Sequence, residues 1–327
     1  MAKKRKPNSA QVITLLIILF ALFKVYVLPN MNIPENNTTL DVQQTEKVSQ
    51  NDNNFQNSDK PKEPTTPIPS IPEENLLKIH YIDVGQADCI LITLNDQTML
   101  IDAGDEAHDD DVVNYLKAQN ITEFDYVIGT HPHADHIGGL DSVINEFAID
   151  TLLMPKAVNT SPSFESVLDA MEHKNLSATS PKIGDTYSFN AAEFTILNSV
   201  DSTPENLNNA SIVIRLVYGE QSYLFTGDAE KAIEYQMMDS GLTLKSNVLK
   251  VAHHGSNTSS LEKFILAVDP DIAVISVGKD NSYGHPHEKI VNRLNRLNIK
   301  TYRTDENGTI IISSDGKFNY VTVEKEG

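Results

Sequence analysis

The spacing of apolar residues divides the chain into three parts. One almost continuous apolar run covers residues 12–28, and residues 30–75 then contain few apolar positions. From residue 76 onward, short apolar runs alternate with longer stretches in which apolar residues recur every three or four positions. These patterns predict, in that order, one hydrophobic helix, a segment without a core and a folded α/β domain.

The folded part is predicted to begin with three strands and then to alternate strands with helices. Its first three apolar runs, 76–82, 89–94 and 98–101, are separated by short turn-forming segments, which is typical of a strand meander. Helices are predicted over 110–119, 139–147, 163–174, 229–239, 260–268 and 286–297, and further strands over 126–129, 151–154, 211–218, 222–225, 248–251, 272–277, 309–312 and 320–323. Because the alternation occurs twice, each time after a strand-rich start, we expect two sheets covered by outer helices, a four-layer αββα sandwich.

The N-terminal run is preceded by a basic segment, residues 3–6. A basic end followed by an apolar stretch is typical of a signal peptide or a signal anchor. Seventeen helical residues reach about 25 Å, slightly less than the ~30 Å hydrocarbon layer. Since no small-residue cleavage site follows, the sequence favours an uncleaved transmembrane anchor over residues 1–29, with the C-terminal part outside the cytoplasm. The alternative is a cleaved signal and a secreted protein.

Residues 30–75 are rich in Asn, Gln, Thr, Ser and Pro. They offer too few apolar side chains to offset chain entropy by burial, so we expect a disordered tether. The folded domain is then predicted to span residues 76–327.

Charge and cysteine content exclude several classes of protein. Lys and Arg number 26 against 45 Asp and Glu, a formal net charge of −19, which argues against binding polyanions by bulk charge. The single cysteine, Cys89, excludes an intrachain disulfide scaffold and a cysteine-rich zinc module. Metal chemistry in this chain must therefore use histidines and carboxylates.

A cluster of such groups follows the predicted strand 126–129. His131, His133, Asp135 and His136 lie within six residues. In a near-extended segment, alternate side chains point the same way, so His131 and His133 could bind one ion while the following turn aims Asp135 and His136 at a neighbouring ion. The alternative is a set of solvated loop histidines.

Two later strand ends offer further ligands. Asp228 follows the predicted strand 222–225, where its carboxylate could bridge two ions, although alone it would be an ordinary turn residue. His253 and His254 follow the strand 248–251. Neighbours on an extended chain face opposite sides, so we expect only one of them to bind metal directly and the other to orient substrate or a ligand.

These motifs, together with Asp102 at the end of an early strand, occur in the order found in the metallo-β-lactamase superfamily, which the chain resembles. It is more closely similar to the extracellular hydrolase domain of the ComEC family of competence proteins, from about residue 76 to the C-terminus. That similarity is carried by Asp83–Asp88, Asn208–Ser211, Leu224–Asp228, His253–Ser256 and Tyr283–His287.

The resemblance implies a pair of divalent metal ions, usually zinc or manganese, that hold a bridging hydroxide for attack on a phosphodiester or ester. By position it assigns His131 and His133 to the first ion, Asp135, His136 and one of His253 or His254 to the second, and Asp228 to both. It also implies that Asp102 orients a metal-binding histidine.

Two further positions follow from the resemblance. His285 precedes a predicted helix, where its imidazole could contact phosphate or protonate a leaving group. Many superfamily members supply a third histidine to the first ion, but the only candidate in that interval here is His173, inside a predicted helix. Residues 208–211 occupy that place instead, and because Asn is a weak ligand, we expect weaker binding of the first ion.

The sequence therefore predicts a membrane-anchored, extracytoplasmic metallohydrolase, a phosphodiesterase or nuclease related to competence and DNA uptake. Its predicted partners are a phosphodiester substrate, either DNA or a cell-wall polymer, and the membrane; no stable protein partner can be inferred. One alternative is an esterase for cell-wall choline-phosphate or teichoic-acid bonds. Another is a metal-binding accessory protein that holds DNA without turnover.

Overall fold

The computed structural model describes residues 75–326. The hydrophobic run at 12–28 and the tether predicted to follow it lie outside the described residues. Within 75–326, no helix has the length and apolar character needed to cross a membrane.

The first sheet has eight strands in the order β15-β14-β1-β2-β3-β4-β5-β6. The first three strands form the predicted antiparallel meander, and β4, β5 and β6 add to it in parallel. The bounds are β1 Leu77–Tyr81, β2 Cys89–Leu94, β3 Gln97–Ala103, β4 Glu123–Ile128, β5 Ala148–Leu153, β6 Ala178–Thr179, β14 Ile310–Ser314 and β15 Asn319–Val323.

The second sheet has seven strands in the order β13-β12-β11-β10-β9-β8-β7. Its β7 to β10 are antiparallel neighbours, whereas β10 to β13 run in parallel. The bounds are β7 Thr186–Phe189, β8 Ala192–Asn198, β9 Val213–Tyr218, β10 Gln221–Phe225, β11 Val248–Lys250, β12 Ile272–Ile275 and β13 Lys300–Arg303.

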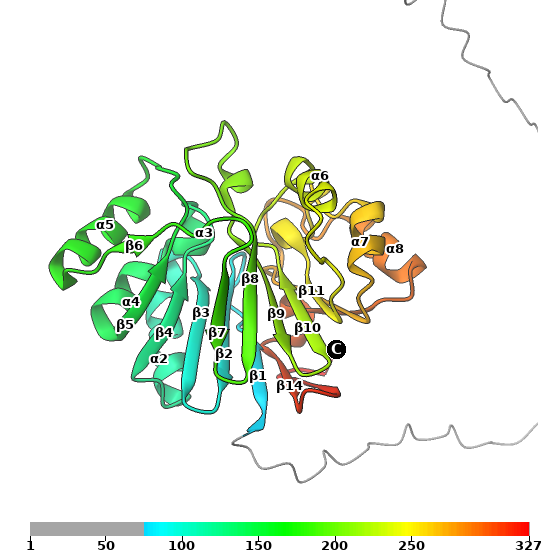
Figure 1. The fold of residues 1–327 in the computed structure, drawn as a ribbon, viewed down its shortest axis with the longest axis horizontal. Helices are drawn as coiled ribbons and strands as arrows, with labels where there is room; N and C mark the ends of the chain where they lie inside the picture. The colour runs from blue at the N-terminus through cyan, green and yellow to red at the C-terminus, as the bar shows by residue number, and fades with distance from the viewer. Residues whose placement is uncertain (1–74, 327) are drawn as a thin grey trace, which may run out of the picture. The chain divides into compact units, whose positions relative to one another are not determined.

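Helices cover the outer face of each sheet (Figure 1). The first sheet carries α2 to α5 and the second carries α6 to α8. The bounds are α2 Asp109–Ala118, α3 Ala134–Ile137, α4 Leu140–Glu146, α5 Pro162–Lys174, α6 Lys231–Asp239, α7 Glu262–Val268, α8 Glu288–Arg296 and α9 Thr304–Asn307. Short 3-10 turns are η3 Glu106–His108, η4 Leu207–Ala210 and η5 Ala252–Gly255.

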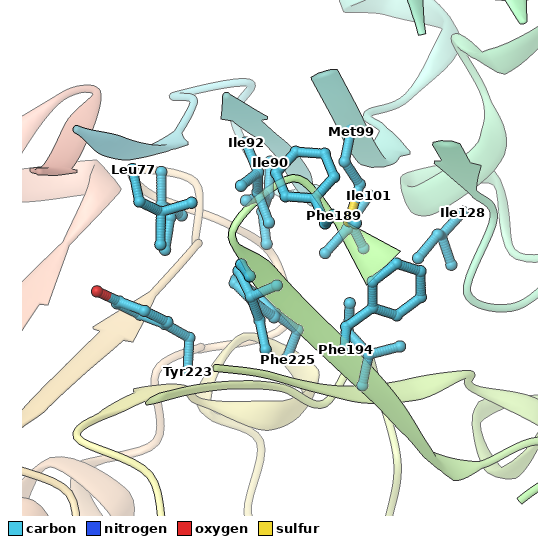
Figure 2. Close-up of a cluster of buried hydrophobic side chains, with 14 of the residues drawn as sticks. Leu77, Ile90, Ile92, Met99, Ile101, Ile128, Phe189, Phe194, Tyr223 and Phe225 are labelled. Atoms are coloured by element: carbon cyan, nitrogen blue, oxygen red, sulfur yellow. The ribbon is translucent and has the colours of Figure 1, made fainter. Parts of the chain in front are cut away.

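The two sheets pack face to face over a core of aliphatic and aromatic side chains. Figure 2 shows part of it, with Ile90 and Ile101 of the first sheet opposite Phe194 and Phe225 of the second. Separate apolar clusters lie between each sheet and its helices. The predicted four-layer αββα sandwich is therefore confirmed for the described residues.

The prediction missed four strands, of which β7, β8 and β13 belong to the second sheet. The edge strand β13 is Lys-Thr-Tyr-Arg, and none of its residues is fully buried, so no apolar run marks it. The two-residue β6 of the first sheet is likewise exposed. The predicted helix 260–268 starts at Glu262, because Ser260 has a positive φ of 57° that a helix cannot include.

Candidate metal centre

The predicted site residues come together where strands of both sheets end. Asp102 lies near the end of β3, and the 131–136 segment follows β4. Asp228 and the pair at 253–254 follow the parallel neighbours β10 and β11. Parallel strands direct their carboxyl ends to one edge of a sheet. The cluster therefore forms where this edge of the first sheet meets the corresponding edge of the second, and each sheet supplies part of it.

The segment after β4 is a tight turn leading into α3, and the expected near-extended backbone is wrong. The backbone N–H of His133 donates to the carbonyl of His131 at 3.0 Å, and α3 begins at Ala134. The two imidazoles still face each other, with 3.0 Å between His131 Nε2 and His133 Nδ1. Asp135 and His136 then lie on the single turn of α3.

Asp228 presents its two carboxylate oxygens to different histidines. Oδ1 lies 3.2 Å from Nε2 of His136 and 3.8 Å from Nε2 of His254. Oδ2 lies 3.6 Å from Nε2 of His253 and 4.0 Å from Nε2 of His131. One carboxylate thus separates two groups of nitrogen atoms, which is the arrangement that a bridging ligand requires.

The expectation that His253 and His254 face opposite sides is wrong, because the backbone there is not extended. Both residues have positive φ, 53° and 51°, within the turn η5. This conformation directs both imidazoles toward Asp228. His254 also lies 3.4 Å from Oδ2 of Asp135, whereas His253 lies on the side of His131.

The resulting cluster fits a divalent cation. One ligand atom from each of Asp135, His136, Asp228 and His254 lies within 4.8 Å of every other. Nε2 of His136, Nε2 of His254 and Oδ1 of Asp228 are buried and form no hydrogen bond within the described structure. Buried polar atoms are almost always paired, and these three converge on one point. Imidazole and carboxylate are suitable ligands for zinc or manganese.

Hydrogen bonds to Nδ1 fix the orientation of two imidazoles, those of His136 and His254. Asp102 accepts a hydrogen bond from Nδ1 of His136 at 2.8 Å, and it also accepts from the backbone N–H and the hydroxyl of Thr130, both at 2.8 Å. His254 donates from Nδ1 to the carbonyl of Ser276 at 3.0 Å. With Nδ1 protonated in both rings, each Nε2 is directed at the centre of the cluster.

A buried ion pair between Asp88 and Lys250 lies beneath the cluster and is not predicted from the sequence. Asp88 lies 3.5 Å from Nδ1 of His254. Its other oxygen forms an ion pair with Lys250 at 2.8 Å, and both side chains are almost completely buried. The signal was available: Lys250 is the one charged residue in the otherwise apolar run 248–252, where a lysine needs a buried partner.

The electrostatics of the cluster favour added positive charge. Burial alone would lower the pKa of His136, but Asp228, Asp102 and Asp135 outweigh it and hold that pKa well above its ordinary value. Burial would likewise raise the pKa of Asp228, but His136 and His254 keep it well below its usual range. The carboxylate of Asp228 therefore remains ionised and attracts protons or cations.

The position of the missing third histidine is filled by η4 and the residue after it. The side-chain Oδ1 of Asn208 is buried without a hydrogen-bond partner in the described structure, and its Nδ2 lies 3.5 Å from Nδ1 of His253. Ser211 accepts the backbone N–H of Asp228 at 3.0 Å. His173 lies in α5, exposed and away from the cluster, as its helical setting predicts.

A cleft of about 330 Å³ opens over the cluster and is lined by Gln86, His133, Asp135, Asn208, Asp228, His253, His254, Tyr283 and His285. The ring of His285 lies 5.5 Å from the ring of His253, centre to centre. Burial, together with the neighbouring His253, His254 and His287, lowers the pKa of His285 to about 4. Its imidazole is therefore neutral at pH 7 and faces the cleft beside the candidate metal ligands.

A family model described as the metallo-beta-lactamase superfamily matches residues 82–279. The chain belongs to this superfamily. Curated relatives include ComE operon protein 3 of Bacillus subtilis (strain 168), 34% identical over 71% of this chain and 32% of its own length. Competence protein ComA of Neisseria gonorrhoeae is 29% identical over 74% of this chain and 33% of its own.

These relatives confirm the resemblance to ComEC-family competence proteins that the motifs indicate. The chain spans about a third of the length of the curated relatives it matches. Among solved structures, the metallo-beta-lactamase fold protein YhfI from Bacillus subtilis is 11% identical, with a TM-score of 0.47, over 73% of this chain and all of its own.

Proposed function

We propose that residues 76–327 form a metal-dependent phosphodiesterase. The observation that carries the proposal is Asp228, whose two oxygens face two separate groups of histidines. Such an arrangement supports two cations held side by side, as in two-metal phosphodiester hydrolysis. Family membership and the competence-protein relatives support the same chemistry.

The residues divide naturally between two cations. His131, His133 and His253 would hold the first, Asp135, His136 and His254 the second, and Asp228 both. With His253, the first ion would have three histidine ligands. His253 would thus replace the third histidine that many superfamily members supply between the 131–136 segment and Asp228. When bound, the cations supply Lewis acidity, which lowers the pKa of water toward neutrality and offsets charge on a phosphate.

The remaining residues orient and bind. Asp102 and the carbonyl of Ser276 hold Nδ1 of His136 and His254, so that neither ring can rotate away. His285 faces the cleft opposite the cluster, where its neutral ring can contact a phosphate oxygen. The amide of Gln86 is fixed by the backbone N–H of Gly278 at 3.0 Å and lies 3.4 Å from Nδ1 of His285, which limits rotation of that ring.

Hydrolysis of bis-p-nitrophenyl phosphate by purified residues 76–327 tests the proposal. We expect activity that requires added Mn²⁺ or Zn²⁺ and falls by at least about a hundredfold in Asp135→Ala. Asp150→Ala, at an exposed position of β5 away from the cluster, is the matched control. Metal binding without turnover, or equal activity in Asp135→Ala, would favour the non-catalytic DNA-holding alternative.

We further propose that the domain acts outside the cytoplasm, attached by an N-terminal anchor. The support is the basic segment 3–6, the apolar run 12–28 and the polar segment 30–75. Protease added to intact cells should then release the folded domain by cleavage in the tether. Recovery of the whole chain from the soluble cytosol would contradict the anchor.

A further inference from the structure

Tyr283 is a large aromatic side chain that the fold leaves exposed at the cleft. It lines the cleft over the candidate metal centre, and 67% of its surface is accessible. One face of its ring lies near the imidazole of His285, with centroids 5.7 Å apart and planes 23° from parallel. The centroid of the His285 ring is in turn 6.3 Å from that of His254, with 23° between the planes, so a row of three rings, each tilted by 23° from the next, leads from the cluster to Tyr283.

The loop that carries Tyr283 is braced by a single side chain. Asn281 accepts the backbone N–H groups of Tyr283 and His285, at 3.1 and 3.0 Å. Its Nδ2 donates to the carbonyls of Gly278 and His285, at 2.9 and 2.5 Å. Exposure of the ring is therefore not the result of a loose loop, because four hydrogen bonds hold the backbone beneath it.

On this basis, and resting on the proposed phosphodiesterase function, we propose that Tyr283 is a stacking subsite for a nucleobase next to the phosphodiester at the metal centre. A base can stack on an aromatic ring whatever its sequence, because every base has a π-face. The bases of a duplex are already stacked on each other, so the subsite favours single-stranded or splayed nucleic acid.

The net negative charge of the protein favours base stacking, rather than contacts to phosphate, as the source of affinity for nucleic acid. The net charge of −19 argues against binding a phosphodiester polymer through many lysine and arginine contacts. A ring contact contributes without cations and is insensitive to salt. A second hollow of about 700 Å³ shares His285 with the cleft, which leaves room for a polymer to continue past His285.

The experiment compares a short oligothymidylate with a backbone of abasic sugar phosphates of the same length. Hydrolysis rates of the two chains are measured at the same Mn²⁺ concentration. Binding of each chain is measured by fluorescence anisotropy in the presence of a chelator, which prevents cleavage. The variants are Tyr283→Leu, which removes the ring, and Tyr283→Phe, which keeps it. Phe318→Leu is the control, since Phe318 is 63% exposed but lies beyond β14, next to the β9–β10 turn at the opposite end of β10 from Asp228.

We expect the wild type to prefer the thymidine chain by about tenfold in kcat/KM and in affinity. Tyr283→Leu should reduce this preference toward one, while Tyr283→Phe and Phe318→Leu retain it. Thermal unfolding and metal content of Tyr283→Leu should match the wild type. Raising the salt concentration should weaken binding of both chains by the same factor, leaving the preference for thymidine intact.

The possible failures are distinguishable. A preference that survives in Tyr283→Leu, or is absent in the wild type, overturns the stacking subsite while leaving the phosphodiesterase proposal intact. Loss of phosphorylcholine-ester cleavage in Tyr283→Leu, without any preference for bases, also overturns it and favours the cell-wall substrate. Base-dependent binding that requires Tyr283, without cleavage of any phosphodiester, supports the subsite and overturns the proposed function.

Discussion

Each imidazole of the centre has one nitrogen directed at the cluster and, for His136 and His254, the other held by a defined acceptor. Asp102 is the acceptor for His136 and is itself fixed by two hydrogen bonds from Thr130. Its positive φ of 59° turns the carboxylate away from the strand direction and toward α3. A charged acceptor also raises the basicity of the histidine, which strengthens the bond that Nε2 can form.

Replacing Asp102 with Asn should therefore weaken metal binding. The amide keeps the shape but loses the negative charge, so we expect affinity for Zn²⁺ or Mn²⁺ to fall by about 10- to 100-fold. Titration against a chelating dye measures this directly. Asp125→Asn is the control, because Asp125 also accepts a backbone N–H, that of Thr98 at 2.8 Å, but lies near the start of β4. Equal losses in both variants would show that the effect is only structural.

The Asp88–Lys250 pair gives a second test at the residue scale. Lys250→Met leaves the buried Asp88 carboxylate without its cation, and an uncompensated buried charge costs about 3–5 kcal/mol. We expect that decrease in the free energy of unfolding, measured by urea denaturation. The double variant Asp88→Asn with Lys250→Met removes both charges and should recover most of it. If the double variant is no more stable than the single one, the ion pair is not the cause.

At the scale of helices, strands and turns, sequence patterns predicted most buried strands better than edges or turns, although the largely buried β8 was missed. The strands that bury alternate or continuous apolar residues, such as β2 and β10, were found within one residue of their bounds. The edge strand β13 has no such pattern because its side chains are only partly covered. Apolar patterns therefore predict the layers of the sandwich, because each layer buries an apolar face. They do not predict the pairing partners of the edge strands, whose side chains are only partly covered.

The sequence indicated residues that converge in the structure, but not the geometry in which they do so. His131, His133, Asp135, His136, Asp228, His253, His254 and His285 all line or underlie one cleft. The roles of His253 and His254 depended on assuming an extended backbone, and two consecutive positive φ angles invalidate that assumption. Lys250 was missed because its partner, Asp88, is remote in sequence.

The loop before α7 offers a pH test that does not involve the metal centre. The carboxylate of Glu234, on α6, accepts the backbone N–H groups of Ser260 and Leu261. Burial raises the pKa of Glu234 to about 7, despite those hydrogen bonds and the nearby cations of Lys231 and Arg293. Because the folded state binds this proton more tightly than the unfolded state, the stabilisation is complete below about pH 4.5 and is lost as the pH rises through about 7.

Relative to Glu234→Gln, the wild type should therefore lose about 3 kcal/mol of unfolding free energy between pH 4.5 and pH 8. Urea denaturation of both proteins across this range measures the difference. Glu193→Gln, an exposed acid on β8, should show no comparable change relative to the wild type. A difference between the wild type and Glu234→Gln that is constant with pH would mean that the carboxyl titrates normally.

At the scale of the whole domain, the candidate metal centre lies across the seam between the two sheets. Asp102 and the 131–136 segment come from the first sheet, while Asp228 and the pair at 253–254 come from the second (Figure 1). Four carboxylates and several imidazoles meet at this seam, and most of them are buried. A bound cation would join side chains from both sheets, so occupancy should affect the stability of the sandwich as a whole.

Metal at about 100 times its Kd should stabilise the folded domain by about 2.7 kcal/mol over the chelated protein. For a domain of this size, that corresponds to a rise in Tm of about 5–10 °C. Thermal denaturation with EDTA and with excess Zn²⁺ or Mn²⁺ measures the shift. Asp228→Ala removes the ligand that faces both groups of histidines, so its shift should be at most half that of the wild type. A wild-type Tm that is the same with metal and with chelator would mean that the convergence of these side chains is a feature of packing rather than of metal binding.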